Sequence, residues 1–384
     1  VLQRHFVYYN DLAQCGGAAM RGGDQLLWLE RLETEQTDIH QAIDWALVHD
    51  IEASARLTAA LHVFWFTRGL NQEATEQCER LIPHRDRLSP QIYPWLLAVY
   101  AEALVLSGNL EDAIFAANQA LPLFQEQNEH VGLTFIYSLL TTTSRRASDD
   151  LDISIQLGET GLQFAPSKGS DSYYTSLLFE TLCDSLTRSG RFDEADAYAK
   201  EGYKLCIQRD DRMCANYLLD QMSFLAIMQN QLAEARRYAE KCLAGSRQFK
   251  MLVSEHLAIE KLIIIAVTEG NFDLAEQFVM DRLVLAREAN FPFYLAGSLL
   301  YMGYINMDQG RYPEALPYLL EAAAIFQKTG DRYFTAGIIQ RLSQWIWHEK
   351  KNGINAARWL ACAHVQRSNQ LNTPISVSSW ASFK

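Results

Sequence analysis

GRYPEA, at Gly310–Ala315, is one copy of a six-residue signal that recurs about every 40 residues along the chain. The clear copies begin with glycine or asparagine and end with alanine: GNLEDA (Gly108–Ala113), GRFDEA (Gly190–Ala195), NQLAEA (Asn230–Ala235) and GNFDLA (Gly270–Ala275). Weaker copies are GLNQEA (Gly69–Ala74), DDLDIS (Asp149–Ser154) and NGINAA (Asn352–Ala357). A fixed period of this size indicates a stacked array of structural repeats. In such an array each repeat packs mainly on its neighbours, so function is expected on an extended surface.

The residues on either side of Gly310 predict two amphipathic helices joined by a tight turn. Apolar residues recur at i, i+3, i+4 and i+7 through Tyr294–Gln309 and again through Tyr312–Thr329. Gly310 would end the first helix in the left-handed conformation that costs glycine least. Pro313 falls in the first turn of the second helix, where its missing N–H is harmless. The chain is therefore expected to be all-α, a succession of about eight helical hairpins.

Small residues also stand at fixed intervals from the turns. One set precedes the turn and another follows it, namely Ala101, Ser223 and Gly303, and Ala120, Gly202 and Ala322. Together with the turn signal, this pattern resembles the tetratricopeptide repeat (TPR), although its period of about 40 residues exceeds the ~34 of that family. The resemblance implies a TPR-like α-solenoid, wound as a right-handed superhelix, that acts by binding a partner.

The ends of the chain carry a second resemblance. WLERLETEQTDIHQAIDWAL (Trp28–Leu47) resembles the segment that follows the ATPase core in STAND-class bacterial signalling ATPases, including LuxR-type, MalT-like transcriptional regulators. Asp38–His40 replaces the Asn-Leu-Arg usual there. FWFTRGLNQEA (Phe64–Ala74) resembles the first hairpin of the same proteins, and AARWLACAHVQRSNQL (Ala356–Leu371) resembles an element near their C-terminal end. The resemblance implies a sensor region that follows an ATPase region of the same protein.

The expected organisation has three parts. Residues 1–68 form a helical linker after a missing ATPase core, with helices over Leu2–Gln14, Asp24–Leu47 and Ala53–Arg68. Residues 69–371 form the repeat array, and residues 372–384 form a C-terminal tail or truncated helix. The glycine-rich stretch Cys15–Asp24 lacks a GK[ST] ending and a preceding strand, so it is expected to be an interhelical loop and not a phosphate loop. Because the chain starts at Val1 without a methionine, it is expected to be a fragment.

Composition excludes several classes of function. The net charge of −12 argues against direct binding of nucleic acid and of anionic lipid. No apolar run is long enough to predict a membrane span. The seven cysteines form no CxxC pair, which favours a reduced, cytoplasmic setting. No HExxH motif, phosphate loop or catalytic triad is evident, so neither a metal, a cofactor nor an active site is expected in this fragment.

The candidate binding residues come from the repeat register. In a TPR array the first helix of each hairpin lines the concave face, and positions in 3-4-3 spacing share one stripe of that helix. Glu180, Asp220 and Glu260 occupy the same stripe position in three consecutive units. The predicted groove comprises Glu180, Asp184, Tyr217, Asp220, Phe224, Glu260, Ile264 and Tyr304. We expect it to suit a cationic and partly apolar partner, such as a basic peptide or an amine-bearing ligand.

An alternative interpretation is a solvated acidic face without a ligand. Neighbouring first helices lie on the order of 10 Å apart, where two carboxylates in water repel by only ~0.4 kcal/mol. Arg145–Arg146, beside Asp149–Asp150, is interpreted as a polar turn.

The expected function is to sense a small molecule, peptide or protein and to regulate the upstream ATPase. A constitutive scaffold for protein assembly, without a ligand switch, is the alternative.

Overall fold

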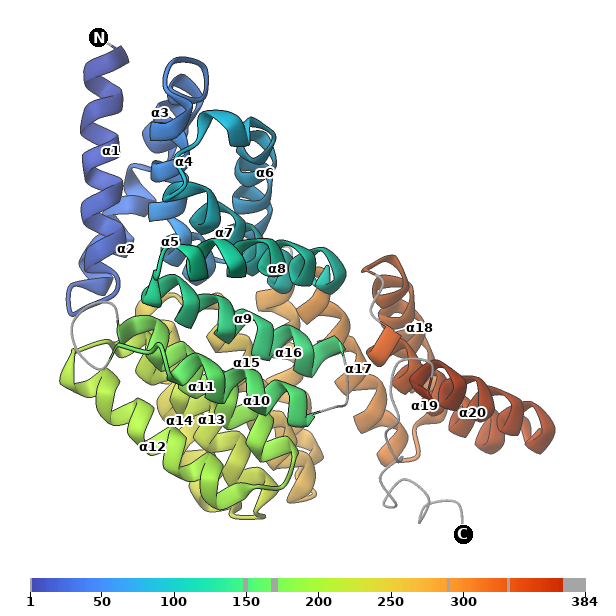
Figure 1. The fold of residues 1–384 in the computed structure, drawn as a ribbon. Coiled ribbons are helices and arrows are strands. Elements are labelled where there is room, and N and C mark those ends of the chain that lie inside the picture. The colour runs from blue at the N-terminus through green and yellow to red at the C-terminus, as the bar shows by residue number, and fades with distance from the viewer. Residues whose placement is uncertain (1, 148–150, 167–171, 289–290, 330–331, 369–384) are drawn as a thin grey trace. The chain divides into compact units, whose positions relative to one another are not determined.

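The computed structural model describes residues 2–147, 151–166, 172–288, 291–329 and 332–368. Over these residues the chain is built from helices, and no strand is present (Figure 1). The first helices are α1 (Leu2–Ala19), α2 (Gln25–Thr34), α3 (Gln36–His49), α4 (Ile51–Ala60), α5 (His62–Arg68), α6 (Asn71–Leu81), the 3-10 helix η1 (Ile82–Arg87), α7 (Ile92–Ser107), α8 (Leu110–Glu126), α9 (His130–Ala147) and α10 (Leu151–Leu162). They are followed by α11 (Ser172–Arg188), α12 (Phe192–Gln208), α13 (Arg212–Met228), α14 (Leu232–Phe249), α15 (Leu252–Thr268), α16 (Phe272–Glu288), α17 (Pro292–Asp308), α18 (Tyr312–Thr329), α19 (Arg332–Lys350) and α20 (Gly353–Ser368). The predicted all-α solenoid is confirmed.

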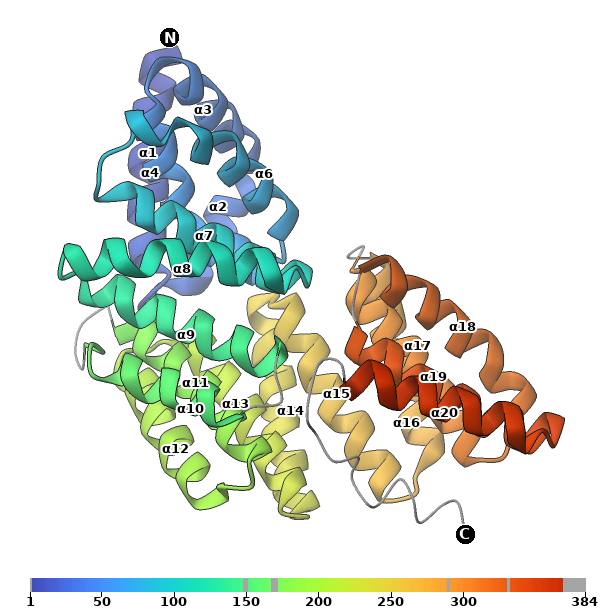
Figure 2. The ribbon, with the colours of Figure 1, turned by 45° about the vertical axis from the view of Figure 1, so that its right-hand side comes forward.

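The turn signals lie between the two helices of a hairpin. A left-handed backbone occurs at Gly69 (φ 68°), Gly108 (84°), Gly190 (80°), Asn230 (59°), Gly270 (75°) and Gly310 (76°). The alanine that closes each signal is fully buried at Ala113, Ala195, Ala235, Ala275 and Ala315. Asp149 lies outside the described residues. Because the turn and the buried alanine recur together, consecutive helices pack as hairpins such as α7–α8, α11–α12 and α13–α14 (Figure 2).

The last copy of the signal is out of register by one residue. Lys351, and not Asn352, has the positive φ, 51°. Ala356 is buried (6% exposed), whereas Ala357 is exposed and Ile354 is 71% exposed. The structural repeat therefore reads KNGINA from Lys351, and the alignment of NGINAA with the other copies was wrong at this hairpin.

The N-terminal helices differ in detail from the prediction. The first helix continues through Cys15 to Ala19, so only the end of the glycine-rich stretch is a turn. A Cβ on Gly17 would lie 2.2 Å from the backbone oxygen of Ala60. Glycine at this position thus lets α1 approach the end of α4. The long helix expected over Asp24–Leu47 is interrupted at Glu35 (φ −96°, ψ 6°), which gives α2 and α3.

The helices form two compact units. One comprises Val1–Arg145 with Leu151–Lys261, and the other comprises Arg146–Asp150 with Leu262–Lys384. The division along the sequence falls within α15. In the second unit, α17 and α18 pack closely, and Gly303 permits this because it has no side chain. A Cβ at this position would lie 2.6 Å from the Leu319 side chain.

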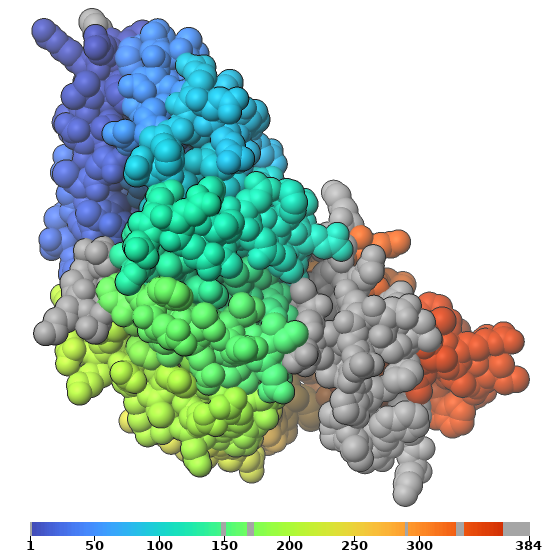
Figure 3. All heavy atoms as spheres, in the orientation of Figure 1, coloured from blue at the N-terminus to red at the C-terminus, as the bar shows by residue number. Residues whose placement is uncertain are grey.

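Within the first unit, helices far apart in the sequence make direct contacts. The Gln25 side chain donates to Asp211 Oδ1 (2.7 Å) and accepts from the backbone N–H groups of Arg212 and Met213 (3.0 and 3.1 Å). Arg68 Nη1 donates to the carbonyl of Phe249 (2.7 Å). Residues of α1–α5 also share one apolar core with residues of α7–α14. The segment expected to be a linker thus packs against the array, and the division at residue 68 stays a prediction. In the space-filling view, the atoms of α8–α10 form a continuous surface on one face of this unit (Figure 3).

Candidate ligand-binding face

Three helices of the first unit carry most of the predicted groove. Each is the first helix of its hairpin, and its turn fixes which residues lie on the stripe. Of the predicted residues, Asp184, Tyr217 and Asp220 are buried, and Glu180, Phe224 and Glu260 are half-buried. Ile264 and Tyr304 are half-buried residues of the second unit. The stripe on α11, α13 and the part of α15 that belongs to the first unit is called the polar stripe below, and it comprises Glu180, Asp184, Asp220, Phe224 and Glu260.

Two carboxylates of the polar stripe, Asp184 and Asp220, are paired with cations. Arg145 Nε lies 2.6 Å from Asp184 Oδ2, and Arg188 Nε lies 2.9 Å from Asp184 Oδ1. Lys261 Nζ lies 3.1 Å from Asp220 Oδ1. These pairs, and not a purely acidic ladder, occupy the stripe. Arg145 lies within α9 and reaches the stripe, so its interpretation as part of a polar turn was wrong.

The position of one of these cations, Lys261, could have been predicted from the repeat register. Lys261 directly follows Glu260 and Gln221 directly follows Asp220, so the two occupy equivalent positions in consecutive repeats. Gln221 Nε2 donates to Glu180 Oε1 at 2.7 Å. In these two repeats the residue after the stripe carboxylate therefore reaches the carboxylate of the preceding repeat. Arg145 had no such signal, because its place depends on how α9 packs.

Burial and neighbouring charges shift the pKa values in opposite directions. Burial raises the pKa of Glu180 to about 8, and the charge of Asp184 adds to this shift. Burial also raises the pKa of Asp220, although Lys261 opposes it. At Asp184 burial has the same tendency, but Arg145 and Arg188 outweigh it and the pKa lies below its ordinary value. The raised pKa of Glu180 favours its protonated form at neutral pH, whereas the lowered pKa of Asp184 favours its ionised form.

An aromatic ring lies among these charges. The guanidinium of Arg188 lies 4.9 Å from the centroid of the Phe224 ring, and the ammonium of Lys261 lies 5.8 Å from it. Phe224 is half-buried. The stripe thus combines hydrogen-bond donors and acceptors with a partly exposed aromatic ring, and typical recognition sites have this composition.

Glu180 gives the first unit a pH-dependent stability. Because its folded pKa, about 8, exceeds the ordinary 4.5, the stabilisation is complete below the ordinary value and is lost as pH rises through the folded value. We expect Glu180→Gln, which cannot ionise, to reduce the fall in unfolding free energy between about pH 6 and pH 9 by on the order of 1–2 kcal/mol, allowing for solvent screening. Chemical denaturation at several pH values measures this change.

The matched control is Glu201→Gln, which removes one carboxylate from the exposed surface of α12. This variant should keep the wild-type dependence of stability on pH. A Glu180→Gln profile that is also superimposable on the wild-type profile would refute the role given to Glu180.

Two further properties concern the described residues. None of their helices combines the length and the apolar character that a membrane crossing requires. They also contain no group of three or more histidine, cysteine, aspartate or glutamate side chains that could hold a metal ion.

A tetratricopeptide-repeat family model matches residues 295–329, which cover the hairpin of α17 and α18. The fold is a TPR-like α-solenoid. No curated protein matches the chain in sequence.

Several solved TPR-like structures cover nearly the whole chain. A Rap protein complexed with competence and sporulation factor has 11% identity and a TM-score of 0.65, covering 96% of this chain and 98% of its own. Human IFIT1, as a dimer with m7Gppp-AAAA, has 12% identity and a TM-score of 0.58, covering 98% and 85%. The apo quorum sensor NprR from B. thuringiensis has 15% identity and a TM-score of 0.55, covering 89% and 97%. At these identities the likeness establishes the fold.

The neighbours also include a STAND protein with a tetratricopeptide-repeat sensor from Pyrococcus horikoshii. It has 12% identity and a TM-score of 0.48, covering 83% of this chain and 48% of its own. At that similarity the regulator class suggested by Trp28–Leu47 stays a prediction.

Proposed function

We propose that this chain is the sensing region of a signal-transduction protein, and that the polar stripe binds a peptide or a protein segment. The observation that carries the proposal is the alignment of Glu180, Asp220 and Phe224 on the first helices of consecutive hairpins. An extended peptide presents backbone N–H and C=O groups at regular intervals, and a row of paired carboxylates and amides offers partners for both. The Rap protein supports this function because its solved complex contains a bound factor.

The charge of the stripe refines the expected partner. Arg145, Arg188 and Lys261 lie among the carboxylates, and the raised pKa of Glu180 removes one negative charge at neutral pH. A strongly basic partner therefore gains less electrostatic attraction from the stripe than it would gain from a row of unpaired carboxylates. We propose a partner with both polar and apolar side chains, held by hydrogen bonds and by contact with Phe224.

Transmission to an upstream ATPase region of the same protein completes the proposal. Adjacent hairpins are coupled through their interfaces, so a ligand that spans several hairpins alters the packing of the first unit. The direct contacts of α2 and α5 with α13 and α14 offer a route from the stripe to the N-terminal helices. The resemblance of Trp28–Leu47 to the STAND segment supports an ATPase as the receiver of this signal.

A binding experiment tests the proposal. Pools of short synthetic peptides with basic, balanced and acidic composition are passed over the immobilised chain, and retained peptides are identified by mass spectrometry. We expect retention from the balanced pool and a loss of about tenfold or more in affinity, at least ~1.4 kcal/mol, in Phe224→Ala and Glu180→Ala, of which the second removes the carboxyl group altogether. Glu201→Gln on the exposed surface of α12 should bind as the wild type does.

The other outcomes are informative. Retention that is unchanged in Phe224→Ala and Glu180→Ala would place the binding site elsewhere and contradict the proposal. If no pool is retained while whole folded proteins are, the constitutive scaffold becomes the better account.

A further inference from the structure

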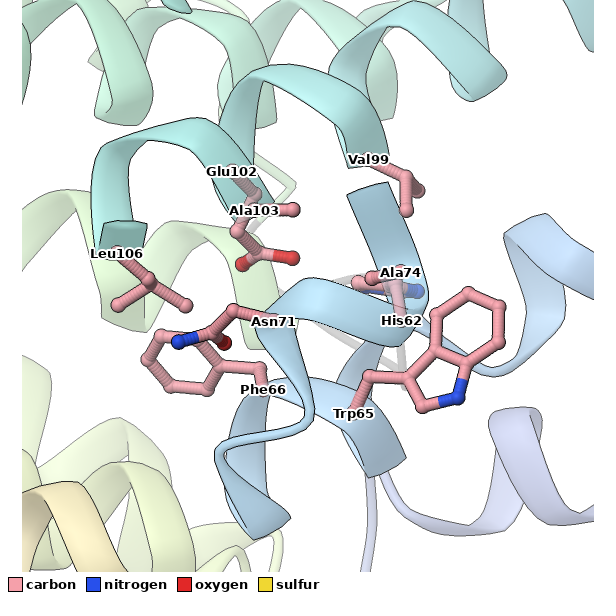
Figure 4. Close-up of a pocket in the computed structure, with 9 residues that line it drawn as sticks. All are labelled: His62, Trp65, Phe66, Asn71, Ala74, Val99, Glu102, Ala103 and Leu106. Carbon is pink, nitrogen blue, oxygen red and sulfur yellow. The ribbon is translucent and has the colours of Figure 1, made fainter. Parts of the chain in front are cut away.

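The space beside Glu102, between α5, α6 and α7 of the first unit, is small (Figure 4). Its volume of about 10 Å³ has room for about one water molecule. Trp65 in its wall is only 2% exposed, so the space does not admit an organic ligand. A larger partner therefore needs another site, and the exposed surface of the second unit offers one.

Apolar side chains are exposed on the second helices of two consecutive hairpins in the second unit. Met280 and Val284 of α16 are each 50% exposed, and Leu320 of α18 is 51% exposed. Pro317 and Ala324 of α18 are also exposed and share a face with Leu320, because residues three and four apart lie on one side of a helix. These five residues are called the outer patch below.

The two helices of the outer patch lie close enough for one partner to contact both. α17 packs against α16 and also against α18. Packed helices lie about 8–10 Å apart, so the axes of α16 and α18 are at most ~20 Å apart. A helix with its side chains is about 10–12 Å wide. One helix of a partner, lying between α16 and α18, would therefore contact both rows of apolar side chains.

The repeat does not require apolar residues at these positions. Met280 and Leu320 occupy equivalent positions in consecutive repeats, after the turn residues of their hairpins. In the first unit the same position holds Lys200 in α12 and Glu240 in α14, and both side chains are exposed. Packing of the hairpins therefore does not select an apolar residue there. Adjacent apolar side chains that are exposed without a role in packing indicate contact with a partner.

The surroundings of the outer patch are acidic. Asp281 and Glu321, which directly follow Met280 and Leu320, are exposed. Further exposed carboxylates of the same two helices are those of Asp273, Glu288 and Glu314. Among the described side chains of α16 and α18, Arg287 is the one exposed cation. A second copy of this chain would bring the same negative charges, which repel, whereas lysine and arginine side chains complement them.

We propose that the outer patch binds an amphipathic helix of a partner protein, with aliphatic residues on its contacting face and basic residues beside them. The aliphatic residues pack on Met280 and Leu320, and the basic residues pair with Asp281 and Glu321. An amphipathic helix commonly binds through its apolar face in this way. This proposal does not depend on the function proposed for the polar stripe, which lies on the first helices of other hairpins.

Fluorescence anisotropy with the whole chain and a designed peptide tests the proposal. The labelled probe has about 20 residues, enough to form a helix, with leucine at i, i+3, i+4 and i+7 spacing and lysine at the flanking positions. One reference peptide has the same composition in scrambled order, and another has glutamate in place of lysine. We expect saturable binding of the probe and at least about tenfold weaker binding of both reference peptides.

Variants of the chain locate the binding site. The double variant Met280→Gln with Leu320→Gln makes two exposed side chains polar but neutral, so it should fold as the wild type does. Its affinity for the probe should fall by about tenfold or more. Ile207→Gln makes the same kind of change on α12, at a side chain that is 56% exposed, and should leave the affinity unchanged. Phe224→Ala, in the polar stripe, should also bind the probe as the wild type does.

Several results would overturn the proposal: no saturable binding of the probe, equal binding of either reference peptide, or unchanged affinity in the double variant. Sedimentation velocity of the chain without peptide tests whether a second copy occupies the outer patch instead. We expect the wild type and the double variant to sediment alike. A wild-type dimer that the double variant abolishes would assign the outer patch to self-association and contradict the proposal.

Discussion

Replacing Lys261 by methionine is expected to destabilise the first unit by about 3–5 kcal/mol at neutral pH. Lys261 and Asp220 are both buried, and the ammonium lies 3.1 Å from the carboxylate. Methionine has a similar length and no charge, so Lys261→Met leaves Asp220 without this counter-ion in a site that is 2% exposed. The loss should be smaller in acid, because protonation of Asp220 removes the unpaired charge. Chemical denaturation at about pH 5 and pH 8 measures both effects.

Two further variants isolate the cause. The double variant Asp220→Asn with Lys261→Met removes both charges, and it should recover most of the lost stability. Lys200→Met breaks the pair between Lys200 and Asp196, which are 64% and 42% exposed, and it should cost no more than about 1 kcal/mol. Equal losses of stability in Lys261→Met and Lys200→Met would show that burial does not determine the contribution of the Lys261–Asp220 pair.

Gly17→Ala is expected to destabilise the first unit by about 1–3 kcal/mol, even though alanine is the better helix former. The new Cβ would lie 2.2 Å from the backbone oxygen of Ala60, so α1 and α4 must move apart. Gly22→Ala is the matched control, because the nearest atom to its Cβ would be 3.7 Å away. Thermal unfolding of both variants measures the difference. A Gly17→Ala protein as stable as Gly22→Ala would show that close helix approach is not required here.

The hairpins could be predicted from sequence because their signals are local. A left-handed residue such as Gly310 and a buried alanine such as Ala315 lie only five residues apart, and both recur in successive units. The last repeat was misaligned because Asn352, the first residue of NGINAA, was taken as the turn residue. In the structure Lys351 adopts the left-handed conformation. The break at Glu35 interrupts the helical hydrogen bonding so briefly that apolar periodicity does not reveal it.

The polar stripe could be predicted only in part. The repeat register places Glu180 and Asp220 on equivalent faces of α11 and α13, and this follows from the period alone. The partners of the carboxylates come from tertiary packing, which brings Arg145 of α9 to Asp184. The contact of Gln25 with Asp211 joins residues far apart in the sequence, and no local pattern marks it.

Amide hydrogen exchange, with and without a peptide retained from the balanced pool, tests whether the polar stripe is the binding site. Binding on the polar stripe should slow exchange in α11 and α13, while their outer partners α12 and α14 change little. The same peptide should have no effect on exchange in Phe224→Ala at the same concentration. Slower exchange confined to α12 and α14, or an unchanged response in Phe224→Ala, would contradict the assignment of the polar stripe as the binding site.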